Sequence, residues 1–198
     1  MPGSGAMAYV DGINSALLPI DDRGLQYGDG LFETLALHNR TPQHWARHFA
    51  RLQAGATRLG IDCPDAGTWL EDLAAAAIDA PGPRLAAKLI LTRGSGGRGY
   101  APPAQARPRR LLQISNWPTW PGISAERGVR VALCDIRLGR NRTLAGIKHL
   151  NRLEQVLGSA EFARSGADEG LMFDDLDQLI EGTRTNVFVV RDGALLTP

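Results

Sequence analysis

Lysine is rare in this chain, since 20 of its 22 basic residues are arginine and only Lys88 and Lys148 are lysine. Arginine stays protonated because its pKa lies above about 12, whereas lysine can act as a neutral amine. Lys148 stands between apolar neighbours, where a loop runs into a predicted helix, and apolar surroundings lower the pKa of an ammonium group. It is therefore a candidate nucleophile towards an aldehyde or ketone. Position alone also fits a solvated lysine at a helix end, and Lys88, in an alternating strand, is expected on a solvent-facing side.

Two further charged groups suit the same chemistry. Glu181 follows a predicted strand and precedes Gly182, and a carboxylate at such a strand end can hold a protonated ring nitrogen. His48 and Arg51 lie three residues apart on a predicted helix and share a face, where the arginine can bind a phosphate. Taken singly, each also has an ordinary interpretation, as an acid in a turn and as a surface pair on a helix.

The glycine-rich segment 94–99 (GSGGRG) superficially matches a dinucleotide-binding fingerprint. That fingerprint requires a helix directly after the glycines, and Pro102 and Pro103 exclude one here. We interpret the segment as an anion-binding loop, in which Arg98 offers a fork for a carboxylate and Tyr100 a hydroxyl. A plain flexible loop is the alternative.

The composition is that of an ordinary globular protein, with 43% hydrophobic and 22% charged residues and a formal net charge of +1. This balance argues against nucleic acid as the main partner, and no apolar run is long enough to predict a membrane span. The N-terminus lacks the pattern of a secretory signal, so a cytoplasmic location is expected. Two cysteines, Cys63 and Cys134, cannot form a disulfide framework or a zinc site, and no metal is expected.

Periodicity predicts an α/β protein of the α+β type. Residues 30–37 and 84–92 alternate as strands do. Residues 43–59 have helical spacing, with Pro42 suited to the helix start and Gly60 expected to end the helix. Residues 68–78 form a second predicted helix, for which Thr68 and Glu71 resemble a capping box.

The proline-rich segment 117–122 is interpreted as a linker between two domains. It separates an N-terminal α/β domain at 1–116 from a C-terminal domain at 123–198. The latter is about half the length of an ordinary domain of roughly 150 residues. We therefore expect the C-terminal domain to be incomplete.

Five stretches carry a resemblance to a known family: DRGLQYGDGLFE, HFARL, RGSGGRGY, LGRNRTLAGIKHLNRLEQVL and IEGTRTNVF. The chain resembles the fold-type IV pyridoxal-phosphate enzymes, the group of branched-chain aminotransferases, D-amino acid aminotransferases and aminodeoxychorismate lyases. The resemblance runs from about Ala8 to the last residue. The third and fourth stretches look like the lyase subgroup specifically.

The resemblance implies a role for each candidate residue. Lys148 matches the lysine that binds pyridoxal 5'-phosphate covalently and acts in catalysis, Glu181 the acid that pairs with its pyridine nitrogen, and Arg51 the arginine that contacts its phosphate. Arg98 and Tyr100 fall where related enzymes place contacts to the substrate carboxylate. The resemblance further implies two α/β domains, a homodimer and a small-molecule substrate.

The implied activity is conversion of 4-amino-4-deoxychorismate to 4-aminobenzoate and pyruvate, within folate biosynthesis. A branched-chain or D-amino acid aminotransferase of the same fold is the first alternative. A truncated, non-catalytic member is the second.

Overall fold

The structure is a computed structural model of the whole chain, and it describes residues 7–78, 80, 82–119 and 126–198. Part of the predicted linker, 120–122, lies outside the described residues. The chain divides into two compact units: Met1–Thr119 with Gly146–Leu150, and Trp120–Ala145 with Asn151–Pro198.

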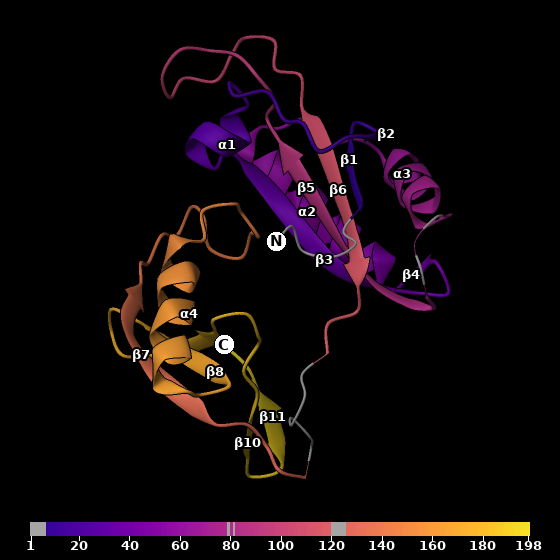
Figure 1. Cartoon of the computed structure of the whole chain (residues 1–198). Helices are drawn as coiled ribbons and strands as arrows, with labels where there is room; N and C mark the ends of the chain where they lie inside the picture. The colour runs from indigo at the N-terminus through magenta and orange to yellow at the C-terminus, as the bar shows by residue number, and fades with distance from the viewer. Residues whose placement is uncertain (1–6, 79, 81, 120–125) are drawn as a thin grey trace. The chain divides into compact units, whose positions relative to one another are not determined.

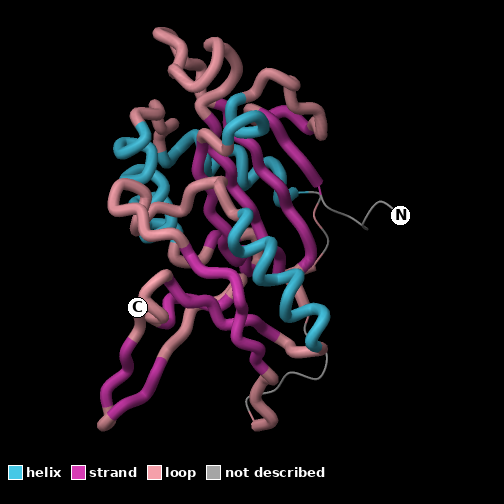
Figure 2. The backbone as a smooth tube through the Cα atoms, turned by 90° about the vertical axis from the view of Figure 1, so that its left-hand side faces the viewer, coloured by secondary structure: helices cyan, strands magenta, loops and turns pink. Residues whose placement is uncertain are grey.

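The first unit is built on a six-stranded antiparallel sheet in the order β2-β1-β6-β5-β3-β4. Figure 1 labels these strands, and Figure 2 shows the long central ones in magenta. Their bounds are Met7–Val10 for β1, Ile13–Asn14 for β2, Gly30–His38 for β3, Thr41–Pro42 for β4, Arg84–Thr92 for β5 and Arg109–Asn116 for β6. The strands predicted at 30–37 and 84–92 are confirmed.

One face of this sheet is apolar and buried. On β3 the odd-numbered residues from Leu31 to Leu37 are buried, while Phe32, Thr34, Ala36 and His38 are not. The register pairs Leu35 with Ala87 and Ala87 with Ile114, so the buried rows of the three central strands share one face. Helix α2 (Trp45–Leu59) packs against β3 and α3 (Ala66–Ile78) against β6, with Leu52 and Trp69 buried.

Both predicted helices exist, but two details of their starts were wrong. Pro42 lies in β4 at the sheet edge, paired with Leu37, where a missing N–H costs no ladder hydrogen bond. The cap of α3 is Asp65, whose Oδ1 accepts the Thr68 N–H at 2.8 Å, so Thr68 does not begin a capping box. Gly60 ends α2 in a left-handed conformation (φ 62°), as its sequence position predicts.

The connection between β5 and β6 contains no helix, which confirms the rejection of a dinucleotide fingerprint. It is drawn as an irregular loop in Figure 2. The turn-rich segment before β3, in contrast, folds into a short helix, α1 (Arg23–Tyr27). The Asp22 side chain begins it by accepting the Gly24 N–H at 2.8 Å.

The second unit contains a three-stranded sheet in the order β7-β8-β9, a helix and a hairpin. Strands β7 (Val131–Leu138) and β8 (Glu169–Asp174) are parallel and are connected through α4 (Leu153–Ser165), while β9 (Leu179–Gly182) is antiparallel to β8. Strands β10 (Val189–Arg191) and β11 (Ala194–Leu196) form the hairpin. Cys134, Leu138 and Met172 form the buried core of the unit.

The units and the predicted domains differ in one respect that concerns the site. The sequence assigns all of 123–198 to the C-terminal domain, but residues Gly146–Leu150 belong to the first unit. The reason is main-chain pairing between this segment and β3, described next.

Candidate active site

Lys148 is held by backbone pairing to the first half of β3. The Phe32 N–H donates to the Lys148 carbonyl at 2.9 Å, the Leu150 N–H donates to the Gly30 carbonyl at 3.0 Å, and His149 forms a bridge with Leu31. The Lys148 Nζ lies 4.6 Å from the centroid of the Phe32 ring. The lysine singled out by the sequence is therefore positioned by a strand-like segment against an aromatic face.

The other lysine contacts the same ring. The Lys88 Nζ lies 5.3 Å from the Phe32 centroid, and Lys88 is exposed, as predicted for a solvent-facing strand position. Both lysines of the chain therefore share one aromatic side chain on the face of the sheet opposite α2.

Arg51 and His48 are brought together by a buried glutamate. Glu33 on β3 is 1% exposed, and its Oε1 and Oε2 accept from Arg51 Nε and Nη2 at 2.6 Å each. His48 Nδ1 lies 2.7 Å from Glu33 Oε2. The hydrogen bonds to Glu33, with their charge attraction, outweigh partial burial and raise the pKa of the Arg51 guanidinium, which stays cationic. His48 and Arg51 do share a face, as predicted.

Glu33 was missed by sequence reasoning, although its position carries a signal. It occupies the same strand parity as Leu31, Leu35 and Leu37, so the alternation itself predicts that it faces the core. A carboxylate at a core position requires a charged or hydrogen-bonding partner. Arg51, on the helix that follows, is that partner.

Glu181 lies on β9 of the second unit, half-buried, opposite Met172. Its Oε1 accepts the amide of Gln155 on α4 at 2.9 Å. Burial lowers the pKa of Arg152, and the negative charges of Glu181 and Glu154 partly oppose that shift. Glu181 therefore interacts with the Gln155 amide and with the positive charge of Arg152, which lies at the start of α4. Lys148 and Arg51 belong to the first unit and Glu181 to the second.

The turn that follows Glu181 is organised by a second glutamate that the sequence analysis did not identify. Glu169 at the start of β8 is 7% exposed. Its Oε1 accepts from Thr183 Oγ1 at 2.6 Å and from the Gly170 N–H at 2.9 Å, and its Oε2 accepts from Thr185 Oγ1 at 3.1 Å. This carboxylate thus holds the turn at residues 182–185 together with main-chain hydrogen bonds from Gly182 to Thr185 and from Thr183 to Gly170.

Arg98 and Tyr100 both lie exposed in the loop between β5 and β6. The Tyr100 ring makes an edge-on contact with Tyr27, with centroids 5.4 Å apart. Neither side chain is in the interior, which suits contact with an external molecule. Both residues belong to the first unit.

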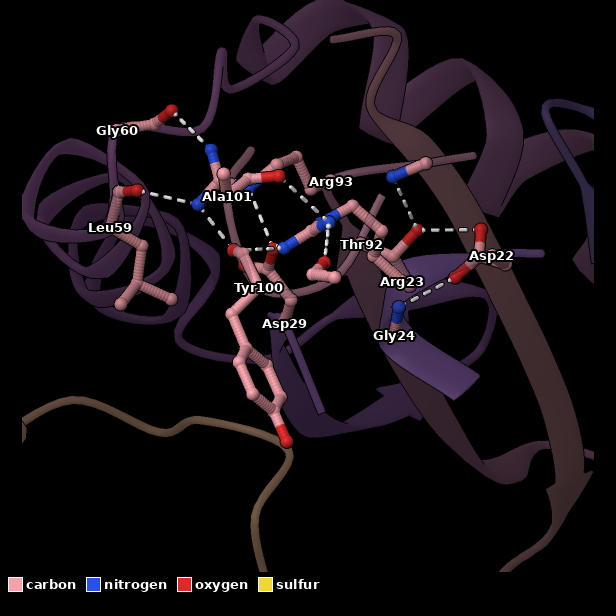
Figure 3. Close-up of polar contacts among 12 residues, drawn as sticks. Asp22, Arg23, Gly24, Asp29, Leu59, Gly60, Thr92, Arg93, Tyr100 and Ala101 are labelled. Carbon is pink, nitrogen blue, oxygen red and sulfur yellow. Dashed lines mark hydrogen bonds and ion pairs between the residues drawn. The ribbon is translucent and has the colours of Figure 1, made fainter. Parts of the chain in front are cut away.

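A network of hydrogen bonds among buried and half-buried charged side chains connects to this loop (Figure 3). Asp29 accepts from Arg23 Nε at 2.8 Å and from Arg93 Nε at 2.7 Å. Burial raises the pKa of Asp29, but hydrogen bonds and charge attraction from Arg93 and Arg23 outweigh it, so the net pKa is lowered. The sequence analysis identified none of these three residues as part of a site.

Other kinds of site are not found in the described part of the chain. There, no group of three or more histidine, cysteine, aspartate or glutamate side chains is arranged to hold a metal ion. Among the described residues, no helix has the length and apolar character to cross a membrane.

Comparisons with known proteins agree on one family. The family model described as amino-transferase class IV matches residues 30–198. An aminodeoxychorismate lyase from Vibrio harveyi is 35% identical over 192 residues, which are 97% of this chain and 70% of that protein. The crystal structure of a 4-amino-4-deoxychorismate lyase from Pseudomonas aeruginosa is 47% identical with a TM-score of 0.88, over 97% of this chain and 70% of that one. A fold IV-transaminase from Curtobacterium pusillum is 29% identical with a TM-score of 0.80, over 98% of this chain and 72% of that one.

Proposed function

The chain belongs to the amino-transferase class IV family, and we propose that it acts as a lyase that converts 4-amino-4-deoxychorismate to 4-aminobenzoate and pyruvate. The observation that carries the proposal is Lys148, one of two lysines in the chain, held by main-chain pairing with its Nζ against Phe32. The lyase assignment draws support from the 47% identity to a 4-amino-4-deoxychorismate lyase, against 29% to a fold IV-transaminase.

The family depends on pyridoxal 5'-phosphate, and the donor set of this chain fits that cofactor. Lys148 provides the amine for covalent attachment. Arg51 provides a permanent cation for the phosphate, because Glu33 takes two of its five N–H donors and 48% of its side chain is exposed. Glu181 provides a carboxylate for the pyridine nitrogen, steadied by Gln155. When bound, the cofactor withdraws electrons from the substrate carbon that bears the amine.

The chain's own residues would each have a separate role in the reaction. Arg98 and Tyr100 bind a carboxylate of the substrate through a charge-assisted and a neutral hydrogen bond. Freed when the substrate amine takes its place, the Lys148 Nζ would take the proton from the ring carbon that bears the substrate nitrogen. The C–O bond to the three-carbon fragment then breaks, and the Nζ would return a proton to that fragment, so one group serves as base and then as acid. Glu181 would keep the pyridine nitrogen of the cofactor protonated. Together, 4-aminobenzoate and pyruvate contain all the atoms of the substrate, so no further reactant is required.

Mass spectrometry tests the assignment of Lys148. We expect the chain incubated with pyridoxal phosphate and borohydride to gain one reduced adduct on the peptide that contains Lys148. The adduct is expected in Lys88→Arg, the matched control, and not in Lys148→Arg. An adduct on Lys88 alone, or none, would refute the proposed site.

An aminotransferase acting on branched-chain or D-amino acids is the second candidate, supported by the similarity to a fold IV-transaminase. Product analysis separates the two. A lyase forms 4-aminobenzoate without an amino acceptor, whereas a transaminase forms a keto acid only when an acceptor is present. Adduct formation with neither product would favour a non-catalytic member.

The setting of the reaction is part of the proposal. We propose a role in folate biosynthesis and a homodimer, because the resemblance implies them, and also a cytoplasmic location. Light scattering on the purified chain would test the dimer, and 4-aminobenzoate auxotrophy of a deletion strain would test the pathway.

A further inference from the structure

Arg23 makes an unusual set of contacts for a residue of a five-residue helix. Its side chain is 4% exposed, and its Nη1 donates to the carbonyls of Gly99 and Ala101 at 3.1 and 3.2 Å, while Nη2 donates to the Tyr100 carbonyl at 2.8 Å. One guanidinium therefore binds three consecutive carbonyls of a loop more than 70 positions away along the chain. Figure 3 shows Arg23 beside Tyr100 and Ala101 of this loop.

The guanidinium is itself fixed from the opposite side. Its Nε donates to Asp29, and Asp29 is held in turn by Arg93. Arg93 also donates to the carbonyls of Leu59 and Gly60 at 2.7 Å each, at the end of α2. The position of Arg23 is thus tied to the end of α2 and to the residue before β3.

Aromatic contacts extend the same arrangement to the surface. The Arg23 Cζ lies 4.9 Å from the Tyr27 ring centroid, and Tyr27 contacts the ring of Tyr100 edge-on. Close approach also restricts the loop, because a Cβ at Gly97 would lie 3.2 Å from Arg23 Nη1 and 2.9 Å from the Ala101 carbonyl. The loop conformation and the guanidinium are therefore mutually dependent.

We propose that Arg23 is a positioning residue for substrate recognition, which fixes the loop at 97–101 so that Arg98 and Tyr100 present a preformed carboxylate-binding surface. Without Arg23, three loop carbonyls lose their donor, and the loop samples other conformations. Substrate binding must then also order the loop, and this unfavourable ordering weakens binding and raises KM. The claim about substrate rests on the proposed function, whereas the claim about the loop does not.

Limited proteolysis tests the claim about the loop without any activity. Trypsin cuts after exposed arginines in mobile loops, and Arg98 directly precedes the first bound carbonyl. We expect Arg23→Ala to be cleaved after Arg98 at least about tenfold faster than the wild-type chain. Arg110→Ala is the matched control, because it removes a part-buried ion pair with Asp72 in the same unit and leaves the loop contacts intact.

Chemical rescue separates positioning from general destabilisation. Ethylguanidinium at millimolar concentration should restore trypsin resistance to Arg23→Ala, because it can donate to the same carbonyls, whereas ethylammonium should not. Arg23→Lys should remain trypsin-sensitive, since a single ammonium lacks the planar fork. Rescue by both cations, or a cleavage rate equal to that of wild type, would overturn the proposal.

Kinetics on the full chain loaded with pyridoxal phosphate test the claim about substrate. In Arg23→Ala we expect KM for 4-amino-4-deoxychorismate to rise about tenfold or more, with kcat within about threefold of wild type and the Lys148 adduct unchanged. An unchanged KM alongside faster cleavage would refute the substrate claim alone. A wild-type chain that forms the adduct but no 4-aminobenzoate would refute the proposed function, and the proteolysis result would still decide the claim about the loop.

Discussion

Replacing Glu33 by glutamine tests the central electrostatic feature of the first unit. The carboxylate is 1% exposed and accepts two hydrogen bonds from Arg51, with His48 Nδ1 at 2.7 Å from its Oε2. Glutamine preserves the shape, but its amide nitrogen must face an N–H donor, and the charge is lost. Breaking a hydrogen bond to a charged group costs about 1.5–3 kcal/mol when the partner stays buried.

Solvent reduces this cost for Arg51. Its side chain is 48% exposed, so the guanidinium regains water when the carboxylate disappears. His48 is 19% exposed and regains less. We therefore expect Glu33→Gln to lower the free energy of unfolding by about 2 kcal/mol, in the middle of the range for a charged hydrogen bond.

Urea denaturation followed by circular dichroism measures this loss. With a slope of about 2 kcal/mol per molar urea, the midpoint should fall by about 1 M. Thr34→Ala is the control, because Thr34 is the adjacent exposed residue on the opposite face of β3, and it should change the midpoint little. A Glu33→Gln midpoint within the error of the wild-type value would show that the pair contributes no net stability.

Three further outcomes follow from the buried charged and thiol groups. The pKa of Asp29 is lower in the folded chain than its ordinary value of 3.8, so its contribution to stability is fully present above that value and is lost as pH falls from 3.8 through the lower folded pKa. Asp29→Asn should flatten the dependence of the urea midpoint on pH below 3.8. Burial raises the pKa of both thiols, but Cys134 is 2% exposed and Cys63 is only half-buried. Iodoacetamide should therefore label Cys63 first and Cys134 only on unfolding, and equal labelling rates would contradict the packing. Glu169→Gln should lower stability by about 2 kcal/mol through its lost hydrogen bonds, and fluorescence titration should show weaker retention of pyridoxal phosphate; unchanged retention would disconnect the 182–185 turn from Glu181.

Local patterns determined much of the framework. The alternation in 30–37 and 84–92 predicted β3 and β5, because a strand buried on one face shows a period of two in the sequence itself. Gly60 predicted the end of α2, because a left-handed cap depends on one residue. The start of each helix was less predictable, since Pro42 and Thr68 fit several local roles and packing at the sheet edge and the Asp65 cap decided between them.

The sequence by itself also identified the candidate residues for unusual chemistry. Lys148 stands out because arginine occupies nearly every other basic position, and that contrast is a property of composition alone. Its attachment to the first unit, in contrast, arises from main-chain bonds to Gly30 and Phe32, more than 100 positions earlier in the chain. No local pattern around Lys148 encodes that pairing.

Only the tertiary structure decided which charges meet. Arg51 pairs with Glu33 across 18 positions, and Arg23 reaches the Gly99 carbonyl across 76. The register of the strands and the course of the loops determine which charged residues come into contact, and both depend on packing over the whole unit. A charged residue in the sequence predicts that a partner is required when it is buried, but the folded chain selects the partner.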